Sequence, residues 1–365
     1  MPTVRDIIHC IEEFAPTFYQ ESYDNSGLQI GNYQLEVKGV LLSVDVTEEV
    51  IDEAASVGAN LIIAHHPLIF AGLKRITGGN YTERTIIKAL KADIAIYSCH
   101  TNMDNISGGV SFKMAEKLGL SNIKVLKPIT GMFYKLVTFV PIDHAEKIRG
   151  VILEAGAGHI GNYDYCSYNL TGEGTFRASE KASPFVGTKG EIHVEPEIRI
   201  ETIFAKHLEN KIIPALIKAH PYEEVAYDIY PLANRNANVG AGIIGDFNQP
   251  VEEKMFLNLL KTIFKMPLIR HTALMGRNIS CVALCGGSGS FLLNDACKVG
   301  ADAFVSADFK YHQFFDADNR ILIADIGHFE SEQFTLEIFY ELLMKNFSNF
   351  AVHFTKVKTN PINYF

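Results

Sequence analysis

The sequence contains few cysteines, no long apolar run and no cluster of basic residues. Its six cysteines are scattered over 365 residues and never occur as C-x-x-C, which indicates free thiols in a reducing compartment rather than a cysteine-rich metal site. No stretch approaches the roughly 18 apolar residues of a membrane span. The first residues mix charged with apolar side chains, unlike a signal peptide. We therefore expect a cytoplasmic protein that makes no contact with membranes.

Charge and composition exclude further classes. Lys and Arg number 33 against 42 Asp and Glu, a formal net charge of −9, which argues against a dedicated nucleic-acid binder. Hydrophobic residues at 47% and charged residues at 21% are ordinary globular values. At about 150 residues per domain, the length predicts about two domains.

The pattern of expected elements changes twice along the chain. Residues 1–128 alternate helices with strands of continuous apolar character, which is typical of a sheet covered on both faces. Residues 129–235 give the order βαββαβ of a ferredoxin-like α+β domain. After an Asn- and Ala-rich link at 232–238, the first pattern resumes. The sequence thus predicts a discontinuous α/β domain, 1–128 with 236–365, that carries an inserted domain at 129–235.

The boundaries of the expected elements are as follows. The insert should contain strands at 132–140, 163–177, 191–205 and 225–230, and helices at 145–155 and 208–218. The α/β domain should contain strands at 39–46, 60–64, 93–97, 280–284, 303–306 and 321–324, and helices at 47–57, 82–90, 252–265, 292–299 and 332–345.

Three expected strands are each followed by side chains that bind metals. Ligands in open α/β sheets collect beyond the carboxyl ends of strands. A single histidine there is usually capped or half-buried, and a His-x-x-x-Glu pair is often a surface charge pair. Three such segments together predict a metal site, and their ligands are too many for one tetrahedral ion, which favours two ions. The candidate ligands are His65 and His66, His100 and Asp104, and His328 and Glu332.

The donor set indicates which ions and which chemistry to expect. Imidazole and carboxylate without thiolate fit Zn, Fe, Mn or Co and disfavour Mg or Ca as sole occupant. Two divalent ions with two carboxylates leave a positive site that attracts hydroxide and an anionic substrate. Such a pair suits hydrolysis of phosphate esters, amidines or ring C–N bonds.

Other polar residues are candidates for the same site. The loop Gly286-Gly287-Ser288-Gly289 follows a strand and precedes a helix, so the amides of Gly287 and Ser288 could receive a phosphate, or the glycines could simply form a tight turn. Lys310 is a candidate for substrate binding and His312, with His100, for proton transfer, although a solvated helix start is the plainer interpretation of Lys310 and His312. Further polar residues at loop or strand ends are Asp24, Asn25, Gly27, Asp45 and Asp308.

Two apparent motifs are discounted. The G-x-G-x-x-G match at 240–245 follows the Asn-rich link and precedes Asp246, which would repel a pyrophosphate, so we expect no dinucleotide cofactor. Ser288 lacks the G-x-S-x-G context of a nucleophile elbow.

Taken together, the motifs resemble those of the NIF-three-like family, whose bacterial members are labelled GTP cyclohydrolase I type 2 homologues. The matching stretches are 24–28, 64–68, 100–104, 286–289, 308–312 and 327–332, and the insert is similar to the CutA and PII type of domain, with 219–224 matching a segment of the longer members. The resemblance implies that His65, His66, Asp104, His328 and Glu332 bind two metal ions, with His100 as a neighbour. It also implies a toroidal homohexamer.

Two functions are therefore expected. The first is a metal-dependent hydrolase, similar to GTP cyclohydrolase, acting on a phosphorylated or nucleotide-like substrate. The alternative is a non-catalytic, ring-shaped scaffold or regulator whose insert binds a partner or effector. Nucleic acid threaded through a ring conflicts with the charge of −9.

Overall fold

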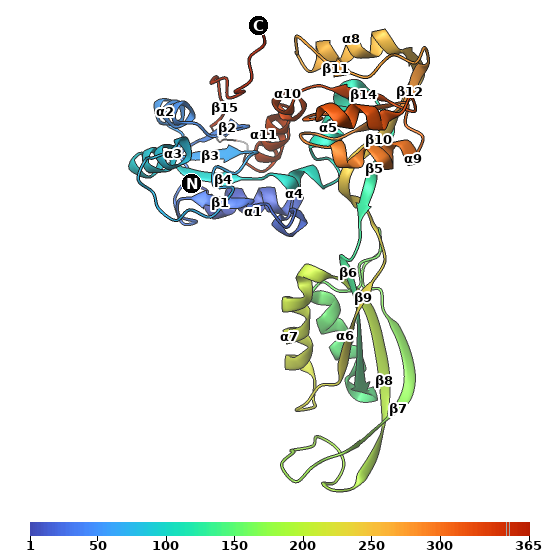
Figure 1. The fold of residues 1–365 in the computed structure, drawn as a ribbon. Coiled ribbons are helices and arrows are strands. Elements are labelled where there is room, and N and C mark those ends of the chain that lie inside the picture. The colour runs from blue at the N-terminus through green and yellow to red at the C-terminus, as the bar shows by residue number, and fades with distance from the viewer. Residues whose placement is uncertain (348, 350) are drawn as a thin grey trace. The chain divides into compact units, whose positions relative to one another are not determined.

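The computed structural model describes residues 1–347, 349 and 351–365. The chain forms two compact units (Figure 1). Unit 1 comprises residues 1–128 and 237–365, and unit 2 comprises residues 129–236.

The first sheet of unit 1 has the strand order β1-β4-β3-β2-β15. Its central strands β2, β3 and β4 are parallel, and helices cover both faces. Leu42, Ile63 and Tyr97 pack with α1 and α11, whereas Leu41 and Ile62 pack on the opposite side with α2 and α3. Two apolar layers explain the continuous apolar runs. The elements are β1 (Gly27–Ile30), β2 (Val40–Ser43), β3 (Leu61–Ala64), β4 (Ala95–Ser98), β15 (Val352–Phe354), α1 (Val4–Phe14), α2 (Glu48–Ser56), α3 (Tyr81–Lys91) and α11 (Thr335–Asn346).

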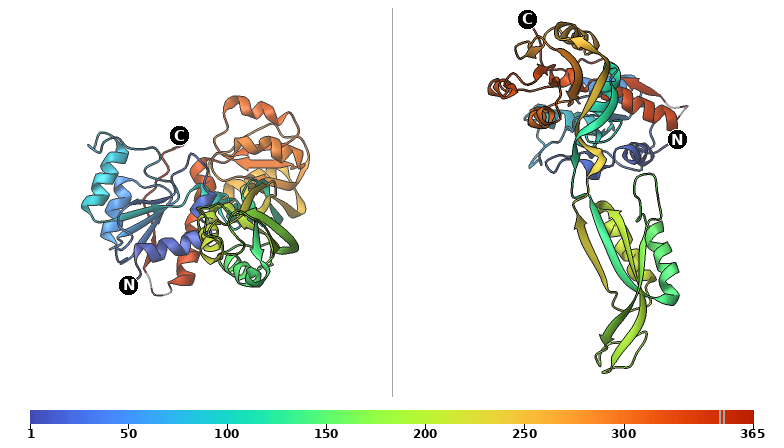
Figure 2. Two further views of the ribbon diagram at one scale, coloured as in Figure 1. Left: turned by 90° about the horizontal axis from the view of Figure 1, so that it is seen from below. Right: turned by 90° about the vertical axis from the view of Figure 1, so that its right-hand side faces the viewer.

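The second sheet of unit 1 has the order β11-β14-β13-β12-β10-β5, with β12, β13 and β14 parallel. Helices α5 and α8 cover one face and α9 the other. Figure 2 shows the two sheets as separate lobes of unit 1. The elements are β5 (Ser121–Ile129), β10 (Asn236–Glu252), β11 (Arg270–His271), β12 (Asn278–Leu284), β13 (Ala303–Ser306), β14 (Leu322–Asp325), α5 (Val110–Leu118), α8 (Glu253–Ile263) and α9 (Leu293–Lys298).

Unit 2 is a four-stranded antiparallel sheet in the order β7-β8-β6-β9. Helices α6 and α7 cover one face of it (Figure 1), and the core between them contains Leu136, Ile148, Ile200 and Leu216. The elements are β6 (Phe133–Pro141), α6 (Ala145–Glu154), β7 (Tyr168–Arg177), β8 (Ile192–Ala205), α7 (Glu209–Ala219) and β9 (Tyr227–Leu232).

Several expected boundaries differ from the structure, and the strands β1, β5, β10, β11 and β15 were not among the expected elements. Strand β7 begins at Tyr168 rather than at residue 163, because Tyr165 has a φ of 54°, which no strand residue adopts. The expected helix at 332–345 corresponds to α11, which begins only at Thr335, and Glu332 instead ends the separate short helix α10 (His328–Glu332).

The expected link at 232–238 is also shorter than predicted, because β10 already begins at Asn236. The glycine motif at 240–245 lies inside β10, where a Cβ on Gly240 would lie 2.1 Å from the Lys127 carbonyl oxygen of the neighbouring β5. Gly240 therefore permits a close approach of two strands.

Among the described residues, no helix is both long enough and apolar enough to cross a bilayer.

Candidate metal site

His65 and His66 leave the carboxyl end of β3 in unit 1. His65 is fully buried, and its Nδ1 lies 3.0 Å from the carbonyl oxygen of Cys99, so Nδ1–H donates to that oxygen and Nε2 faces the site. His66 is held by Asp45, whose Oδ1 lies 2.7 Å from Nδ1. Each ring is thus fixed at one nitrogen and presents the other.

The second segment follows β4. His100 precedes the short helix α4 (Thr101–Asp104), and its Nδ1 lies 2.8 Å from Oδ1 of Asp24. The His100 ring centroid lies 5.3 Å from that of His65 and 5.4 Å from that of His66. Asp104 ends α4 and faces the same histidines.

The third segment follows β14 in the other sheet. His328 and Glu332 begin and end α10, so the i, i+4 spacing brings Nε2 of His328 to 3.2 Å from Oε2 of Glu332. Asp308 holds the other ring nitrogen of His328 at 2.6 Å. Glu332 is only 2% exposed.

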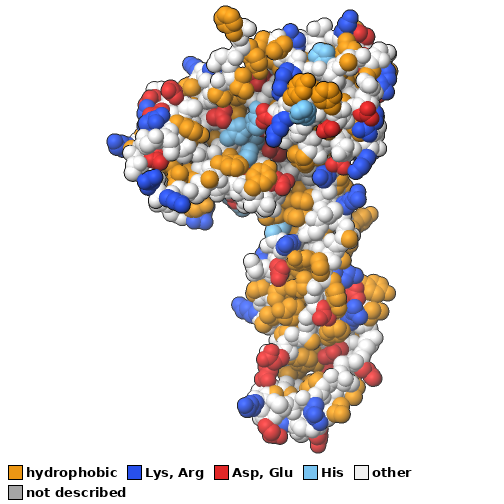
Figure 3. All heavy atoms as spheres, viewed as in Figure 1, with side chains coloured by type: hydrophobic (Ala, Val, Ile, Leu, Met, Phe, Trp, Pro, Cys, Tyr) orange, Lys and Arg blue, Asp and Glu red, His pale blue; other side chains and the backbone are white. Residues whose placement is uncertain are grey.

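The ligand atoms form two groups that share Glu332. Its Oε2 lies 2.8 Å from Nε2 of His66 and 3.2 Å from Nε2 of His328. Its Oε1 lies 3.6 Å from Nε2 of His65, which is itself 3.6 Å from Oδ1 of Asp104. A third group joins the imidazoles of His65, His66 and His100. Figure 3 shows histidine side chains gathered at one place on the face of unit 1.

Several buried polar atoms of the cluster lack hydrogen-bond partners within the described part of the chain. Nε2 of His65, Oδ1 of Asp104 and Oε2 of Glu332 are buried, and the described residues give none of them a hydrogen bond of good geometry. Buried polar atoms are normally paired. Since the three atoms belong to groups whose donors lie within 4.8 Å of one another, the buried His and Glu residues could hold a metal ion.

Burial and neighbouring charge shift the pKa values within this cluster. Burial lowers the pKa of His65, which favours the neutral imidazole that a metal requires. Burial also disfavours the charged imidazoles of His66 and His328, but neighbouring carboxylates outweigh it. Glu332 and Asp45 raise the pKa of His66 to about 10, and Asp308 and Glu332 raise the pKa of His328 to about 11. Burial and the charge of Glu332 raise the pKa of Asp104 well above its usual range.

The glycine loop supports the site in a way that differs from the expectation. The amides of Gly287 and Gly289 donate to the hydroxyls of Ser331 and Ser306, at 2.9 Å in both cases, so the Gly287 amide is not free to receive a phosphate. A Cβ on Gly287 would lie 2.2 Å from Oε1 of Glu332, so the glycine leaves space for this carboxylate. Ser288 is the exposed residue of the loop.

Lys310 and His312 lie outside the cluster. Both are exposed, and among the described residues His312 makes ring contacts with Tyr311 and Phe315 rather than with a ligand of the site. Lys310 directly precedes a 3-10 helix at Tyr311–Ala317, and His312 lies in its first turn. These positions correspond to the plainer interpretation, a solvated helix start. The geometry thus brings together all six candidate ligands and leaves out this pair.

Three aspartates that the sequence named only as polar candidates for the same site orient the histidines. Asp45, Asp24 and Asp308 each accept at Nδ1 of one imidazole and so direct its Nε2 inward. The sequence could have indicated these aspartates only by their positions, because each lies after a strand or in a loop near the segments that carry the histidines. Nothing in the spacing tells which aspartate meets which histidine.

Buried imidazoles and carboxylates at the strand ends of a mixed α/β fold define a candidate metal-binding protein. The model of the Duf34/NIF3 (NGG1p interacting factor 3) family matches residues 2–361, and the chain belongs to this family.

Individual relatives agree with this assignment. A protein of Halalkalibacterium halodurans named "GTP cyclohydrolase 1 type 2 homolog" is 42% identical over 324 residues, which cover 88% of this chain and 87% of that protein. The Bacillus subtilis protein of the same name is 38% identical over 365 residues, covering 99% of this chain and 98% of that protein. The solved structure of a Bacillus cereus protein related to NIF3 is 39% identical, with a TM-score of 0.82 and coverage of 100% of this chain and 99% of that chain.

Proposed function

We propose that unit 1 binds two divalent metal ions that share the Glu332 carboxylate. The observation that carries this proposal is the division of the ligands into two groups, with one oxygen of Glu332 facing each group. His66 and His328 would hold one ion, and His65 and Asp104 the other. Zinc fits this donor set best, with iron, manganese or cobalt as alternatives.

The chemistry that fits this site is hydrolysis. When bound, a pair of divalent ions lowers the pKa of water and stabilises the negative charge that develops on the reacting oxygens. His100 lies beside both ligand histidines and is held at Nδ1 by Asp24, so its Nε2 can accept or deliver a proton at the site.

A phosphorylated or nucleotide-like substrate suits the surroundings of the site. Phe70 is 52% exposed and its ring centroid lies 6.1 Å from that of His100, while Tyr23 is 63% exposed and lies 6.3 Å from Phe70. These rings offer a flat ligand a surface for stacking. The names of the relatives, homologues of GTP cyclohydrolase, motivate GTP as the first substrate to test.

Metal content and turnover test this function together. Protein reconstituted with zinc, iron, manganese or cobalt is assayed for two ions per chain by elemental analysis, and for opening of the GTP imidazole ring and release of phosphate. Wild type should turn over at least one substrate, and Glu332→Ala should lose the metal and the activity. Equal rates for the two proteins would rule out the metal-dependent reaction.

A second candidate function is a ring-shaped scaffold or regulator in which unit 2 binds a partner or effector. It is favoured by the separation of unit 2 as a compact body with its own core and a pocket. We infer that unit 2 is an inserted ferredoxin-like domain of the PII and CutA kind. Support comes from its order β6-α6-β7-β8-α7-β9 and from the sheet order, which places the first and third strands at the centre.

The toroidal homohexamer remains a proposal that rests on the resemblance to the family. Light scattering of the purified chain should give a mass six times 40.6 kDa. A monomer at micromolar concentration would contradict the ring, and with it the scaffold function, without bearing on metal-dependent hydrolysis.

A further inference from the structure

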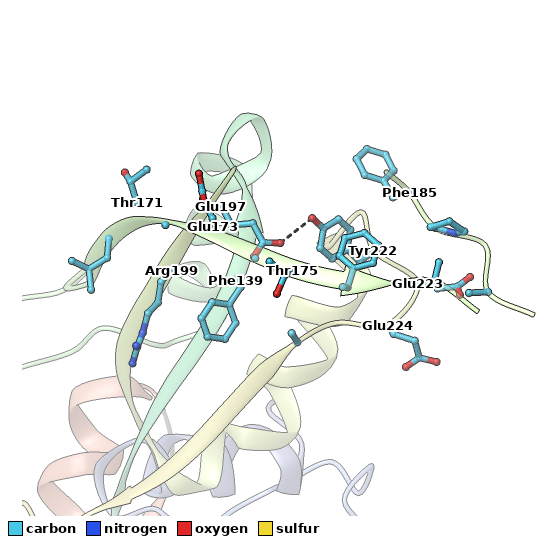
Figure 4. Close-up of a pocket in the computed structure, with 18 residues that line it drawn as sticks. Phe139, Thr171, Glu173, Thr175, Phe185, Glu197, Arg199, Tyr222, Glu223 and Glu224 are labelled. Carbon is cyan, nitrogen blue, oxygen red and sulfur yellow. Dashed lines mark hydrogen bonds between the residues drawn. The ribbon is translucent and has the colours of Figure 1, made fainter. Parts of the chain in front are cut away.

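Unit 2 contains a pocket of about 580 Å³ that the metal chemistry does not use. Its lining comes from β6, β7 and β8, from the loop that follows β7 and from the segment between α7 and β9 (Figure 4). Pockets of a few hundred Å³ with a mainly apolar lining and a few placed polar groups are typical of small-molecule sites.

Aromatic rings form one part of the lining. The ring centroid of Tyr222 lies 6.4 Å from that of Phe176 and 6.2 Å from that of Phe185. Glu223 holds the loop that carries Phe185. The backbone amide of Ser183 donates to Oε1 and Oε2 of Glu223, at 2.9 and 3.0 Å. Because the faces of aromatic rings carry partial negative charge, such a group of rings attracts an organic cation.

A buried carboxylate lies among these rings. Glu197 is 8% exposed, and its Oε1 accepts the hydroxyl of Tyr222 at 2.9 Å (Figure 4). The described residues provide no hydrogen-bond donor to Oε2. A Cβ on Gly174 would lie 2.2 Å from that oxygen, so the glycine leaves space for the carboxylate. A buried carboxylate with an open acceptor favours a positively charged partner.

The other charges of the lining do not supply that partner. Arg199 is the basic residue of the lining. Its Nη2 pairs with Glu201 at 2.8 Å, its Nε is buried with no hydrogen-bond partner among the described residues, and Figure 4 shows its side chain apart from the pair of Glu197 and Tyr222. The remaining charged lining residues, Glu173, Glu223 and Glu224, are acidic and disfavour an anion. Among the described residues, ligand groups close enough for a metal ion occur in unit 1 and not in this pocket.

We infer that this pocket binds an organic ammonium ion with an apolar body, such as a primary amine on an aromatic or aliphatic skeleton. The ammonium group bonds to Oε2 of Glu197, and the body lies against Phe176, Phe185 and Tyr222. The inference deepens the second function proposed above, and rests on it in treating unit 2 as a binding module. It is independent of metal-dependent hydrolysis.

Three probes that share a phenethyl group test the selectivity of the full-length protein by calorimetric titration. They are phenethylammonium, 2-phenylethanol and 3-phenylpropionate, which differ in charge. The cation should bind at least about tenfold more tightly than the alcohol, since one desolvated charge contact of this kind is worth that much. The anion should bind more weakly than either. Equal affinities, or no binding of the cation, would overturn the inference.

Variants separate the charge contact from the ring contacts. Glu197→Gln keeps an acceptor for Tyr222 and should abolish the preference for the cation while leaving the binding of 2-phenylethanol unchanged. Phe185→Ala should weaken all binding, and Gly174→Ala should act like Glu197→Gln by displacing the carboxylate. Glu146→Gln, at an exposed position of α6 outside the lining, is the matched control and should behave as wild type. An unchanged cation preference in Glu197→Gln would contradict the proposed contact. Metal content measured on the same samples should stay constant, so failure here remains distinct from failure of the metal site.

Discussion

The candidate metal site of unit 1 and the pocket of unit 2 share one local feature, a buried carboxylate packed against a glycine. Glu332 and Glu197 are both nearly buried, and each has one oxygen against a glycine where an added Cβ would lie 2.2 Å away. In both regions, therefore, a glycine leaves the space that the carboxylate occupies. What differs is the set of groups that faces the carboxylate.

The surroundings decide which cation each carboxylate suits. Three imidazoles face Glu332 with their Nε2 atoms, and hydrogen bonds at their Nδ1 atoms keep them in that orientation. The phenol hydroxyl of Tyr222 donates to Glu197, and aromatic rings line the same pocket. Fixed lone pairs suit a small divalent ion, whereas ring faces suit a larger organic cation. The comparison shows that a buried acid alone does not identify its ligand.

The largest expected effect is a difference in metal content between a variant of Glu332 and a variant of Glu197. Glu332→Ala should lose both ions, because each ligand group would lose its shared member, whereas His65→Ala should retain about one ion per chain. Glu197→Ala should retain both ions. Elemental analysis of the three variants measures this directly. If Glu332→Ala still held one ion, the sharing of Glu332 would be wrong.

The next effect concerns the glycine of the metal site. Gly287→Ala would place a Cβ against Oε1 of Glu332 and should weaken metal binding about a hundredfold, as expected when a ligand is displaced from a coordination site. Backbone strain alone must be controlled for, because Gly287 has a φ of 60°. Gly300→Ala supplies the control, since Gly300 has a φ of 78° but open space around its Cα. Competition with a chromogenic chelator measures both affinities. Equal weakening in the two variants would assign the effect to strain.

Much of the metal site was accessible from the sequence because its strands are short, apolar and buried on both faces. His65 and His66, for instance, directly follow four fully buried residues, and His328 and Glu332 are spaced by one helical turn. Such local signals place side chains at the end of a strand. The meeting of two different sheets, which brings His66 to 3.3 Å from His328, is not encoded in any local pattern.

The pocket of unit 2 lay beyond sequence reasoning for the same reason. Gly174, Glu197 and Tyr222 come from three separate segments. Tyr222 lies in the stretch 219–224, which the resemblance to the family had singled out, but nothing in that stretch indicates a pocket. No strand was expected where β10 lies, because Asn and Gly are typical of loops, whereas pairing with β12 and β5 stabilises the strand. Tertiary contacts, rather than propensity, determined both features.

A smaller effect tests the aspartates that hold the imidazoles. Asp308→Asn and Asp45→Asn should each weaken metal binding tenfold to a hundredfold, because an outer hydrogen bond fixes the ring and increases its basicity. Asp318→Asn is the control, since the Asp318 side chain is 78% exposed and its ionic partner is Arg320 rather than a histidine. The same chelator competition applies. Wild-type affinity in both variants would show that packing alone orients the two rings.

The smallest expected effect is a count of protons. In the metal-free protein, the pKa values of about 10 for His66 and about 11 for His328 keep both imidazoles protonated at pH 7.5, whereas the lowered pKa of His65 leaves it neutral. A metal ligand must be deprotonated, so binding at this pH should release at least two protons, two from the imidazoles and a further contribution from Asp104, whose pKa is also raised, and affinity should fall as the pH decreases. Titration calorimetry in two buffers of different ionisation enthalpy gives the number. Asp308→Asn removes a group that raises the pKa of His328 and should reduce the release by up to one proton. A release near zero in wild type would mean that Glu332, Asp45 and Asp308 do not keep these imidazoles protonated.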